Sequence, residues 1–409
     1  MKKIVVNGGR KLEGDVVISG SKNAALPIIF ACILTNGVSE IENLPDIGDV
    51  RVALDILASF GALIERREGV TFIDTRKLSY VRPDPGPVSK IRASTYLLGS
   101  CLSRFGRCHL MPFGGCNFSL RPIDMHIDAC VALGARQVKD TIVADRLTGG
   151  KIAFRQASVG ATVNAILLSV CAEGETLISG CAVEPHIDSL IVFLRSCGAD
   201  IVRRGRELVV NGRPLHGGKV RVIGDMIEAG SYLALGALCG GTLRLVNAPI
   251  EDMTEIDRCL KELGANTRFF DGSVVINGCT DCKYLSLTAS PYPGFPTDLQ
   301  PIFAPLMAAG TGGMITDEVW PTRFGYLKTL ECLGVKYKTM NNSALIYPSK
   351  IVSGICSATD LRGGMACLIS ALFTAGQSEI YSAEVILRGY ENLQEKLCTI
   401  GADIEIIDN

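Results

Sequence analysis

The feature that most constrains the fold is a pattern that recurs six times along the chain. In each copy a leucine, or Cys130 in the second copy, is followed by three residues, a glycine and then alanine or valine. The glycines are Gly61, Gly134, Gly198, Gly264, Gly334 and Gly401, spaced about 64 to 73 residues apart. A glycine at this place ends a helix in a left-handed conformation, and a β-branched stretch follows it. The pattern therefore predicts six repeats of helix, turn and strand.

Each repeat also contains a second, more apolar helical segment. These helices are predicted over residues 24–34, 94–102, 161–172, 231–238, 299–309 and 366–374. A helix that is apolar on all sides is buried, so we expect an α/β fold in which sheets lie outside buried helices. Three repeats per domain predict a first domain over residues 20–228. The second domain is predicted over residues 1–19 plus 229–409, with 1–19 as a strand pair that completes its last repeat.

Composition excludes several classes of protein. Lys and Arg total 41 against 42 Asp and Glu, so no overall charge favours nucleic acid or an anionic membrane. Apolar runs shorter than about 20 residues predict neither a signal peptide nor a membrane span, and we expect a cytoplasmic protein. Most of the 16 cysteines lie in apolar helical runs, where reduced thiols pack as small apolar groups. The single C-x-x-C at Cys279 and Cys282 has no second pair nearby, so no metal site is predicted.

A cysteine loop carries the first candidate for chemistry. Residues 112–122 read Pro-Phe-Gly-Gly-Cys-Asn-Phe-Ser-Leu-Arg-Pro, which places Cys116 after two glycines and five residues before Arg121. The prolines and glycines predict a surface loop. A thiol beside a guanidinium can act as a nucleophile or proton donor near neutral pH. The structural alternative is a cysteine that packs as a small buried hydrophobe.

Three of the apolar helices begin with a basic residue, where a cation opposes the helix dipole. These residues are Lys22, Arg92 and Arg362, and Arg388 precedes the last amphipathic helix. Each alone fits a solvated surface base. Their recurrence at equivalent places in a repeat favours an anion held among them.

Two further helix starts carry polar groups. Ser158, Val159 and Gly160 begin the third apolar helix and offer backbone N–H groups that suit phosphate oxygens. Asp298 precedes the helix predicted from residue 299. It is interpreted either as an N-cap or as a general base.

Six motifs occur together in a fixed order: Ser21-Lys22-Asn23-Ala24-Ala25, Gly114-Gly115-Cys116, Arg121-Pro122-Ile123-Asp124, Ser158-Val159-Gly160-Ala161-Thr162, Phe295-Pro296-Thr297-Asp298 and Arg388-Gly389-Tyr390. In this order they resemble the family of UDP-N-acetylglucosamine 1-carboxyvinyltransferases over essentially the whole chain. The resemblance implies an inside-out α/β barrel of two similar domains. It also implies transfer of the enolpyruvyl group of phosphoenolpyruvate to the 3-hydroxyl of UDP-N-acetylglucosamine with release of phosphate, the first committed step of peptidoglycan precursor synthesis for the cell wall. No metal or other cofactor is implied.

The resemblance also implies a role for each matching residue. Cys116 corresponds to the proton donor, which can form a covalent adduct, and Asp298 to the base. Lys22, Arg121 and Arg388 correspond to the residues that bind phosphoenolpyruvate. The positions that hold the nucleotide sugar or complete the active site are Asn23, Arg92, Arg121, Pro122, Ile123, Asp124, Met125, Ser158, Val159, Gly160, Val319, Arg323 and Arg362.

The chain departs from the family pattern at three places without losing a residue assigned to chemistry. Phe113 is inserted before Gly-Gly-Cys, Ser119 stands where the family has glycine, and Val163 stands where it commonly has glutamate. Two alternatives stay open. A sister family transfers the same group to shikimate 3-phosphate, but the Gly-Gly-Cys loop and the Arg-Pro-x-Asp run are not expected in it. A non-catalytic sensing homologue would not need the acid and the base.

Overall fold

The computed structural model describes residues 2–114, 122–279 and 281–408, and the chain forms two compact units. Unit 1 contains residues 2–19, 224–279 and 281–408, and unit 2 contains residues 20–114 and 122–223. The chain passes between the units after residue 19 and again after residue 223. The sequence pattern placed the second passage after residue 228.

The six repeat glycines adopt the left-handed conformation that the sequence predicted, with φ from 88° at Gly334 to 101° at Gly61. Each glycine follows an amphipathic helix: α2 (Gly48–Ser59), α5 (Asp124–Ala132), α7 (Pro185–Ser196), α9 (Thr254–Leu263), α11 (Tyr326–Glu331) and α14 (Leu393–Thr399). A strand begins within three residues of each glycine: β5 (Leu63–Arg67), β8 (Arg136–Val138), β12 (Asp200–Arg204), β17 (Asn266–Phe270), β21 (Lys336–Met340) and β25 (Ile404–Asp408). Glycine permits this reversal because it has no Cβ to clash at positive φ.

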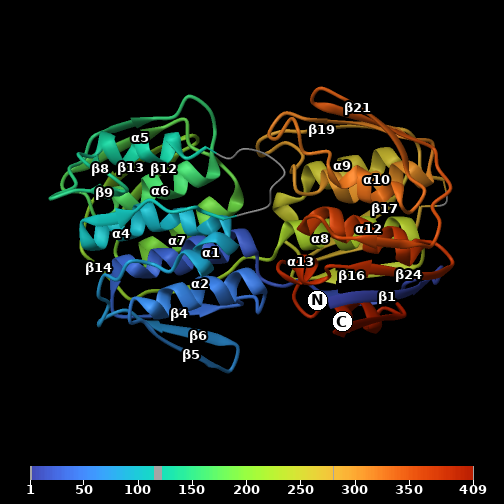
Figure 1. Ribbon diagram of the computed structural model, residues 1–409, viewed down its shortest axis with the longest axis horizontal. Helices are drawn as coiled ribbons and strands as arrows, with labels where there is room; N and C mark the ends of the chain where they lie inside the picture. The colour runs from blue at the N-terminus through green and yellow to red at the C-terminus, as the bar shows by residue number, and fades with distance from the viewer. Residues whose placement is uncertain (1, 115–121, 280, 409) are drawn as a thin grey trace. The chain divides into compact units, whose positions relative to one another are not determined.

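The second helix of each repeat is buried, as predicted. These helices are α1 (Lys22–Ala31), α4 (Leu97–Phe105), α6 (Val159–Ser169), α8 (Met226–Cys239), α10 (Gln300–Ala309) and α12 (Leu361–Phe373). In unit 1, α8, α10 and α12 lie inside, and strands such as β1 (Lys2–Gly8) and β19 (Leu285–Ala289) lie outside them (Figure 1). The α/β architecture of buried helices and outer sheets is therefore confirmed. Among the described residues, every helix is too short or too polar to cross a bilayer.

Unit 1 contains three four-stranded sheets. Their orders are β17-β18-β16-β2, β19-β20-β22-β21 and β23-β24-β1-β25. The strands not yet located are β2 (Gly14–Val17), β16 (Thr242–Val246), β18 (Ser273–Asn277), β20 (Gly313–Asp317), β22 (Ser343–Tyr347), β23 (Ile355–Ser357) and β24 (Gly376–Tyr381). In each sheet one pairing is parallel, at the strand that precedes a buried helix.

Unit 2 has the same plan. Its larger sheets are ordered β15-β4-β6-β5, β7-β9-β8 and β10-β11-β13-β12, and β14 pairs with β3. The remaining strands are β3 (Thr35–Asn36), β4 (Val38–Glu42), β6 (Val70–Asp74), β7 (Arg107–His109), β9 (Thr141–Val143), β10 (Lys151–Ala153), β11 (Glu175–Ser179), β13 (Glu207–Asn211), β14 (Leu215–His216) and β15 (Lys219–Arg221). Three short helical segments complete the unit: η1 (Cys32–Leu34) follows α1, and α3 (Pro85–Lys90) and η2 (Arg92–Tyr96) lie between β6 and α4.

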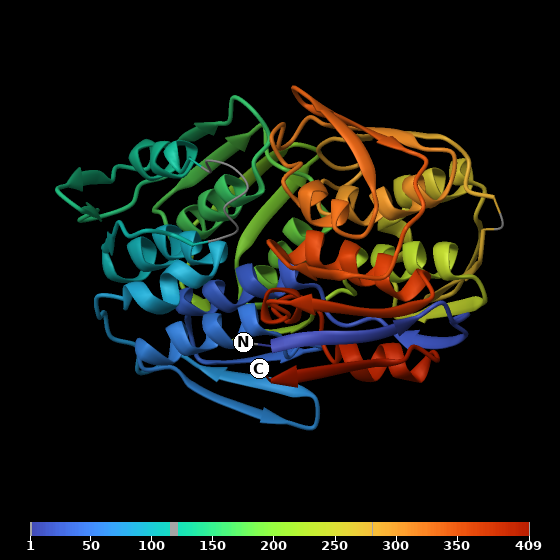
Figure 2. The same ribbon diagram turned by 45° about the vertical axis from the view of Figure 1, so that its right-hand side comes forward.

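The N-terminal segment differs from its prediction. β1 lies between β24 and β25 in the last sheet of unit 1, as Figure 2 shows. β2 instead pairs with β16 and forms the edge of a different sheet, β17-β18-β16-β2. The prediction that residues 1–19 complete one repeat is therefore wrong for β2. The physical reason is that α8 begins directly after the passage at residue 223, so the sheet of the fourth repeat has no preceding edge strand of its own. β2 satisfies the backbone groups that this edge would otherwise expose.

Most cysteines of the described part of the chain are buried or half-buried free thiols, as predicted, whereas Cys332 and Cys398 are exposed. Cys32, Cys101 and Cys367 are buried in apolar helices, and Cys171 and Cys239 are half-buried. Burial raises the pKa of the Cys239 thiol to about 12. At neutral pH these thiols therefore stay protonated and behave as small apolar groups.

Replacing Gly264 with alanine tests the repeat turn. Gly264 has a φ of 99°, and an added Cβ would come no closer than 3.4 Å to a neighbouring atom, so the cost is backbone strain rather than a clash. We expect the free energy of unfolding to fall by about 1 kcal/mol, measured by urea denaturation. Gly325→Ala is the matched control, because Gly325 has a φ of −59° and open space around it. Equal losses in the two variants would contradict the role of the left-handed turn.

Candidate functional site

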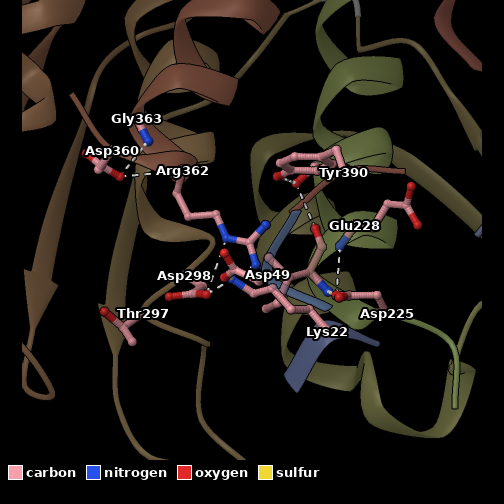
Figure 3. Close-up of polar contacts among 12 residues, drawn as sticks. Lys22, Asp49, Asp225, Glu228, Thr297, Asp298, Asp360, Arg362, Gly363 and Tyr390 are labelled. Carbon is pink, nitrogen blue, oxygen red and sulfur yellow. Dashed lines mark hydrogen bonds and ion pairs between the residues drawn. The ribbon is translucent and has the colours of Figure 1, made fainter. Parts of the chain in front are cut away.

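Asp298 is the centre of a charged cluster in unit 1. Its Oδ1 accepts a hydrogen bond from Nη1 of Arg323 at 2.7 Å. Its Oδ2 accepts from Nε and Nη2 of Arg362 at 3.3 Å each (Figure 3). The side chains of Arg323 and Arg362 are only 7% and 2% exposed, whereas that of Asp298 is 29% exposed. The carboxylate is thus the part of this cluster that a ligand can reach, and the two guanidinium groups fix its orientation from behind.

The structure tests the N-cap interpretation of Asp298, whereas the general-base interpretation stays a prediction. Helix α10 begins at Gln300, and its N-cap residue is Leu299. The hydrogen bonds of the Asp298 carboxylate to Arg323 and Arg362 are those of an ion-pair cluster. The N-cap interpretation is therefore wrong, and Asp298 is a candidate for chemistry.

Arg362 is placed in this cluster by the start of helix α12. Asp360 caps the helix by accepting hydrogen bonds from the backbone N–H groups of Arg362 and Gly363, each at 3.0 Å (Figure 3). The guanidinium carbon of Arg362 lies 5.3 Å from the centre of the Tyr390 ring. A cation in a first turn is unfavourable by itself, so the carboxylate of Asp298 and the ring of Tyr390 compensate it.

A second carboxylate, Asp317, is buried beside this cluster. Thr297 donates from Oγ1 to Oδ2 of Asp317 at 2.6 Å and accepts from Nη1 of Arg323 at 3.2 Å. The backbone N–H groups of Val319 and Trp320 donate to Oδ1 of Asp317 at 2.9 and 2.7 Å. Burial raises the pKa of Asp317, and these hydrogen bonds oppose the rise. Thr297 therefore connects the buried acid to the arginine that holds Asp298.

The remaining predicted residue of unit 1, Arg388, is half-buried and lies between helix α13 (Glu384–Leu387) and Tyr390. The hydroxyl of Tyr390 is 2.8 Å from Oγ of Ser231. Because Tyr390 is anchored on one side by Ser231 and faces Arg362 on the other, the backbone that carries Arg388 is held next to the cluster.

In unit 2, Lys22 is paired at the start of helix α1. Its Nζ lies 3.3 Å from Oδ2 of Asp49, a residue of the first turn of α2, and the two side chains are 13% and 7% exposed. Figure 3 also shows this pair. The carboxylate stabilises the cation that the helix dipole disfavours. Asn23, the next residue, is half-buried in the same turn.

The starts of helices α5 and α6 lie against each other. Ser158 caps α6 by accepting a hydrogen bond from the N–H of Ala161 at 3.3 Å. A Cβ added to Gly160 would lie 2.9 Å from Cε1 of His126, so only glycine permits this approach. Nδ1 of buried His126 is 2.7 Å from Nδ2 of Asn164. Burial and the nearby Arg92 lower the pKa of His126 to about 4, which keeps the imidazole neutral at pH 7.

Asp124, the first residue of helix α5, forms an ion pair with Arg155. Nη2 of Arg155 donates to Oδ2 of Asp124 and lowers the pKa of that carboxyl group. The other oxygen, Oδ1, is buried and has no hydrogen-bond partner within the described ranges. Asp124 therefore keeps unused accepting capacity next to two helix N-termini, which are donors for anions and polar ligands.

The predicted site residues are thus distributed over both units. Unit 1 holds Asp298, Val319, Arg323, Arg362 and Arg388, and unit 2 holds Lys22, Asn23, Arg92, Pro122, Ile123, Asp124, Met125, Ser158, Val159 and Gly160. Cys116 and Arg121 lie outside the described residues.

Sequence reasoning missed five residues of these clusters: Asp49, Thr297, Asp317, His126 and Arg155. Thr297 was part of a quoted motif, and His126 directly follows Met125, but nothing in the pattern distinguished Asp49, Asp317 or Arg155 from ordinary surface or capping residues. Among residues 2–114, 122–279 and 281–408, groups of three or more His, Cys, Asp or Glu side chains placed to hold a metal ion are absent.

Comparisons with known proteins agree with this architecture. The profile of the family described as EPSP synthase (3-phosphoshikimate 1-carboxyvinyltransferase) matches residues 6–397. Among solved structures, the enolpyruvyl transferase NikO from Streptomyces tendae superposes with a TM-score of 0.90 at 26% identity over 99% of both chains. An EPSP synthase from Acinetobacter baumannii gives a TM-score of 0.75 at 19% identity over 100% of both chains. The chain therefore belongs to the EPSP synthase family of enolpyruvyl transferases.

Relatives that match over their full length carry a more particular name. The UDP-N-acetylglucosamine 1-carboxyvinyltransferase 2 of Clostridium acetobutylicum is 39% identical over 99% of both chains. The UDP-N-acetylglucosamine 1-carboxyvinyltransferase 2 of Lactococcus lactis subsp. lactis is 36% identical over 100% of both chains. The resemblance inferred from the six motifs is confirmed by these relatives.

Replacing Thr297 with valine tests the connection between the two acidic groups. The variant keeps the shape of the side chain but removes one donor to buried Asp317 and one acceptor for Arg323. We expect the free energy of unfolding to fall by about 1–3 kcal/mol, measured by urea denaturation. Thr297→Ser keeps the hydroxyl and should lose less than half as much. A loss in the serine variant as large as in the valine variant, or no loss in the valine variant, would contradict the role of the hydroxyl.

Proposed function

We propose that this protein transfers the enolpyruvyl group of phosphoenolpyruvate to the 3-hydroxyl of UDP-N-acetylglucosamine and releases phosphate. The observation that carries the proposal is Asp298, an accessible carboxylate held by two buried arginines, in a chain whose full-length relatives are named for this reaction. The step belongs to the synthesis of peptidoglycan precursors. Both substrates are soluble anions, and we propose that the protein acts in the cytoplasm.

The acid and the base have separate tasks. Cys116 donates a proton to carbon 3 of phosphoenolpyruvate, which makes carbon 2 electrophilic. Asp298 accepts the proton of the sugar hydroxyl as its oxygen attacks carbon 2. Each carboxylate oxygen can accept more than one hydrogen bond, so the bonds from Arg323 and Arg362 are compatible with a further donor on the exposed side of Asp298.

Phosphoenolpyruvate is a small anion with several charges, and it needs a set of cations. We assign Lys22, Arg121 and Arg388 to this task. Preorganised cations contribute most where negative charge develops, here on the departing phosphate. Arg362 and Arg323 then act indirectly, because they hold the carboxylate of Asp298 in place.

The nucleotide sugar is assigned to the helix starts of unit 2. The N-termini of α5 and α6 supply backbone donors for the diphosphate. The predicted contacts are Asn23, Arg92, Arg121 to Met125 and Ser158 to Gly160, together with Val319, which belongs to unit 1. The neighbouring ion pair of Asp124 and Arg155 supports this assignment. Asp124 adds an acceptor for an N–H group of the nucleobase, and Arg155 adds a cation for a phosphate group.

The two alternatives are less well supported. The family profile carries the name of the enzyme that uses shikimate 3-phosphate, but the EPSP synthase structure is only 19% identical to this chain, against 36% and 39% for the named UDP-N-acetylglucosamine enzymes. A sensing homologue has no need for a carboxylate fixed by two buried arginines.

Phosphate release in the presence of both substrates tests the proposal. We expect the wild-type protein to release phosphate with UDP-N-acetylglucosamine and not with shikimate 3-phosphate. Loss of a general acid or base typically lowers kcat by about 10²–10⁴-fold, so Cys116→Ala and Asp298→Asn should fall in that range. Circular dichroism and nucleotide-sugar binding confirm that each variant is folded. A folded wild-type protein that binds the nucleotide sugar but releases no phosphate would favour the sensing homologue.

Alkylation by fosfomycin, an epoxide phosphonate that mimics phosphoenolpyruvate, tests the role of Cys116. We expect the intact-protein mass to increase by one adduct and a peptide map to place it on Cys116. Cys332 and Cys398 are exposed and serve as internal controls, because accessibility alone would modify them as well. An adduct on either control, or none at all, would contradict the assigned role.

A further inference from the structure

A polar cavity of about 720 Å³ lies in unit 2 at the C-terminal ends of helices α4 and α6. Four arginines line it, Arg104, Arg107, Arg136 and Arg146, and we refer to it as the arginine pocket. Asp145 is the single acidic residue of its lining. A cavity of this volume is in the range that holds a small-molecule ligand.

Sheet register places two of these arginines on one face. Arg107 of β7 and Arg136 of β8 are both paired with Val143 of the central strand β9. Directly paired residues of antiparallel strands point to the same side, and strands two apart are separated by about 10 Å. Both positive side chains therefore start from the same face of the sheet, and an anion bound between them would interact favourably with both.

The local partners of these arginines do not neutralise the pocket. Arg136 pairs with Asp145 at 3.1 Å, and Arg146 pairs with Glu173. The guanidinium of Arg107 lies over the ring of Tyr80, at 5.4 Å from its centre, which positions the group without cancelling its charge. The ion pairs are exposed, so they are weak and can be exchanged for a ligand.

The lining favours reversible binding over covalent chemistry. Cys171 lies at the pocket beside Arg104, and its burial raises the pKa of the thiol to about 11 although Arg104 opposes the rise. The thiol is therefore protonated and unreactive at neutral pH. Guanidinium groups, in contrast, bind phosphoryl oxygens through two parallel hydrogen bonds.

We propose that the arginine pocket is a binding site for a small phosphorylated metabolite that carries two or more phosphate charges. Arg107 and Arg136 share one face of the sheet and can each bind a phosphoryl group, and Arg104 and Arg146 add two more cations to the lining. The site is distinct from the helix starts assigned to the nucleotide sugar. Helix α6 has its N-terminus at those starts and its C-terminus at the pocket, about 16 Å away for 11 residues. The inference therefore does not depend on the proposed function.

Calorimetric titration of the full-length protein with inorganic tripolyphosphate, at physiological salt, tests the site. The double variant Arg107→Gln/Arg136→Gln removes both charges of the register pair. We expect its affinity for tripolyphosphate to fall at least about tenfold, with enolpyruvyl transfer in the absence of tripolyphosphate unchanged within about twofold.

Two control variants make the result specific. Arg66→Gln/Arg67→Gln removes the same charge from β5, which does not line the pocket, and Lys22→Ala removes a cation assigned to phosphoenolpyruvate. Both should bind tripolyphosphate as the wild type does. Absence of binding to the wild type, an equal loss in the β5 variant, or a loss confined to Lys22→Ala would each overturn the proposal. Binding of an acidic peptide such as hexaglutamate in preference to tripolyphosphate would also overturn it.

Discussion

The buried start of an apolar helix is the constraint on which the rest of this structure depends. A helix enclosed by its own sheets still presents several unpaired N–H groups in its first turn. Burying such a group without a hydrogen-bond partner is unfavourable for stability. In three of the buried helices, polar side chains accept hydrogen bonds from these N–H groups. Asp225 accepts from the N–H groups of Ile227 and Glu228 at the start of α8, Asp360 caps α12, and Ser158 caps α6. Polar side chains are therefore concentrated at the starts of α6, α8 and α12, and several candidate functional residues lie at such helix starts.

Charge at these helix starts is balanced locally. Lys22 and Arg362 oppose the dipoles of α1 and α12, and each is compensated by a carboxylate from a neighbouring element, Asp49 and Asp298. In α8 the first turn holds an acid instead. Glu228 accepts hydrogen bonds from Lys396 and from the N–H of Ser19, and burial raises its pKa. Such pairs add little net stability when buried, but they fix orientation. Asp298 is partly exposed while both of its arginines are buried.

Much of the fold could be predicted from the sequence because it depends on local physics. The six left-handed glycines end the six amphipathic helices of the repeat, and apolar composition on every face predicted which helices are buried. The error at β2 has a non-local cause. β2 pairs with β16, although the paired residues are more than 200 positions apart in the sequence. The four residues of β2 contain no pattern that predicts which strand they pair with. Asp49, Asp317 and Arg155 were missed for the same reason, since each acts through a residue of another element.

The sequence by itself determined the repeat, the buried helices, the family and the residue types available for chemistry, because short-range periodicity and ordered motifs encode these properties directly. Only the tertiary structure decided that Asp298 does not cap helix α10, which acids hold Lys22 and Arg323, and that four arginines line one cavity. Those outcomes depend on the distances between side chains of different elements. Such distances follow from how helices and sheets pack, and no spacing along the chain specifies them.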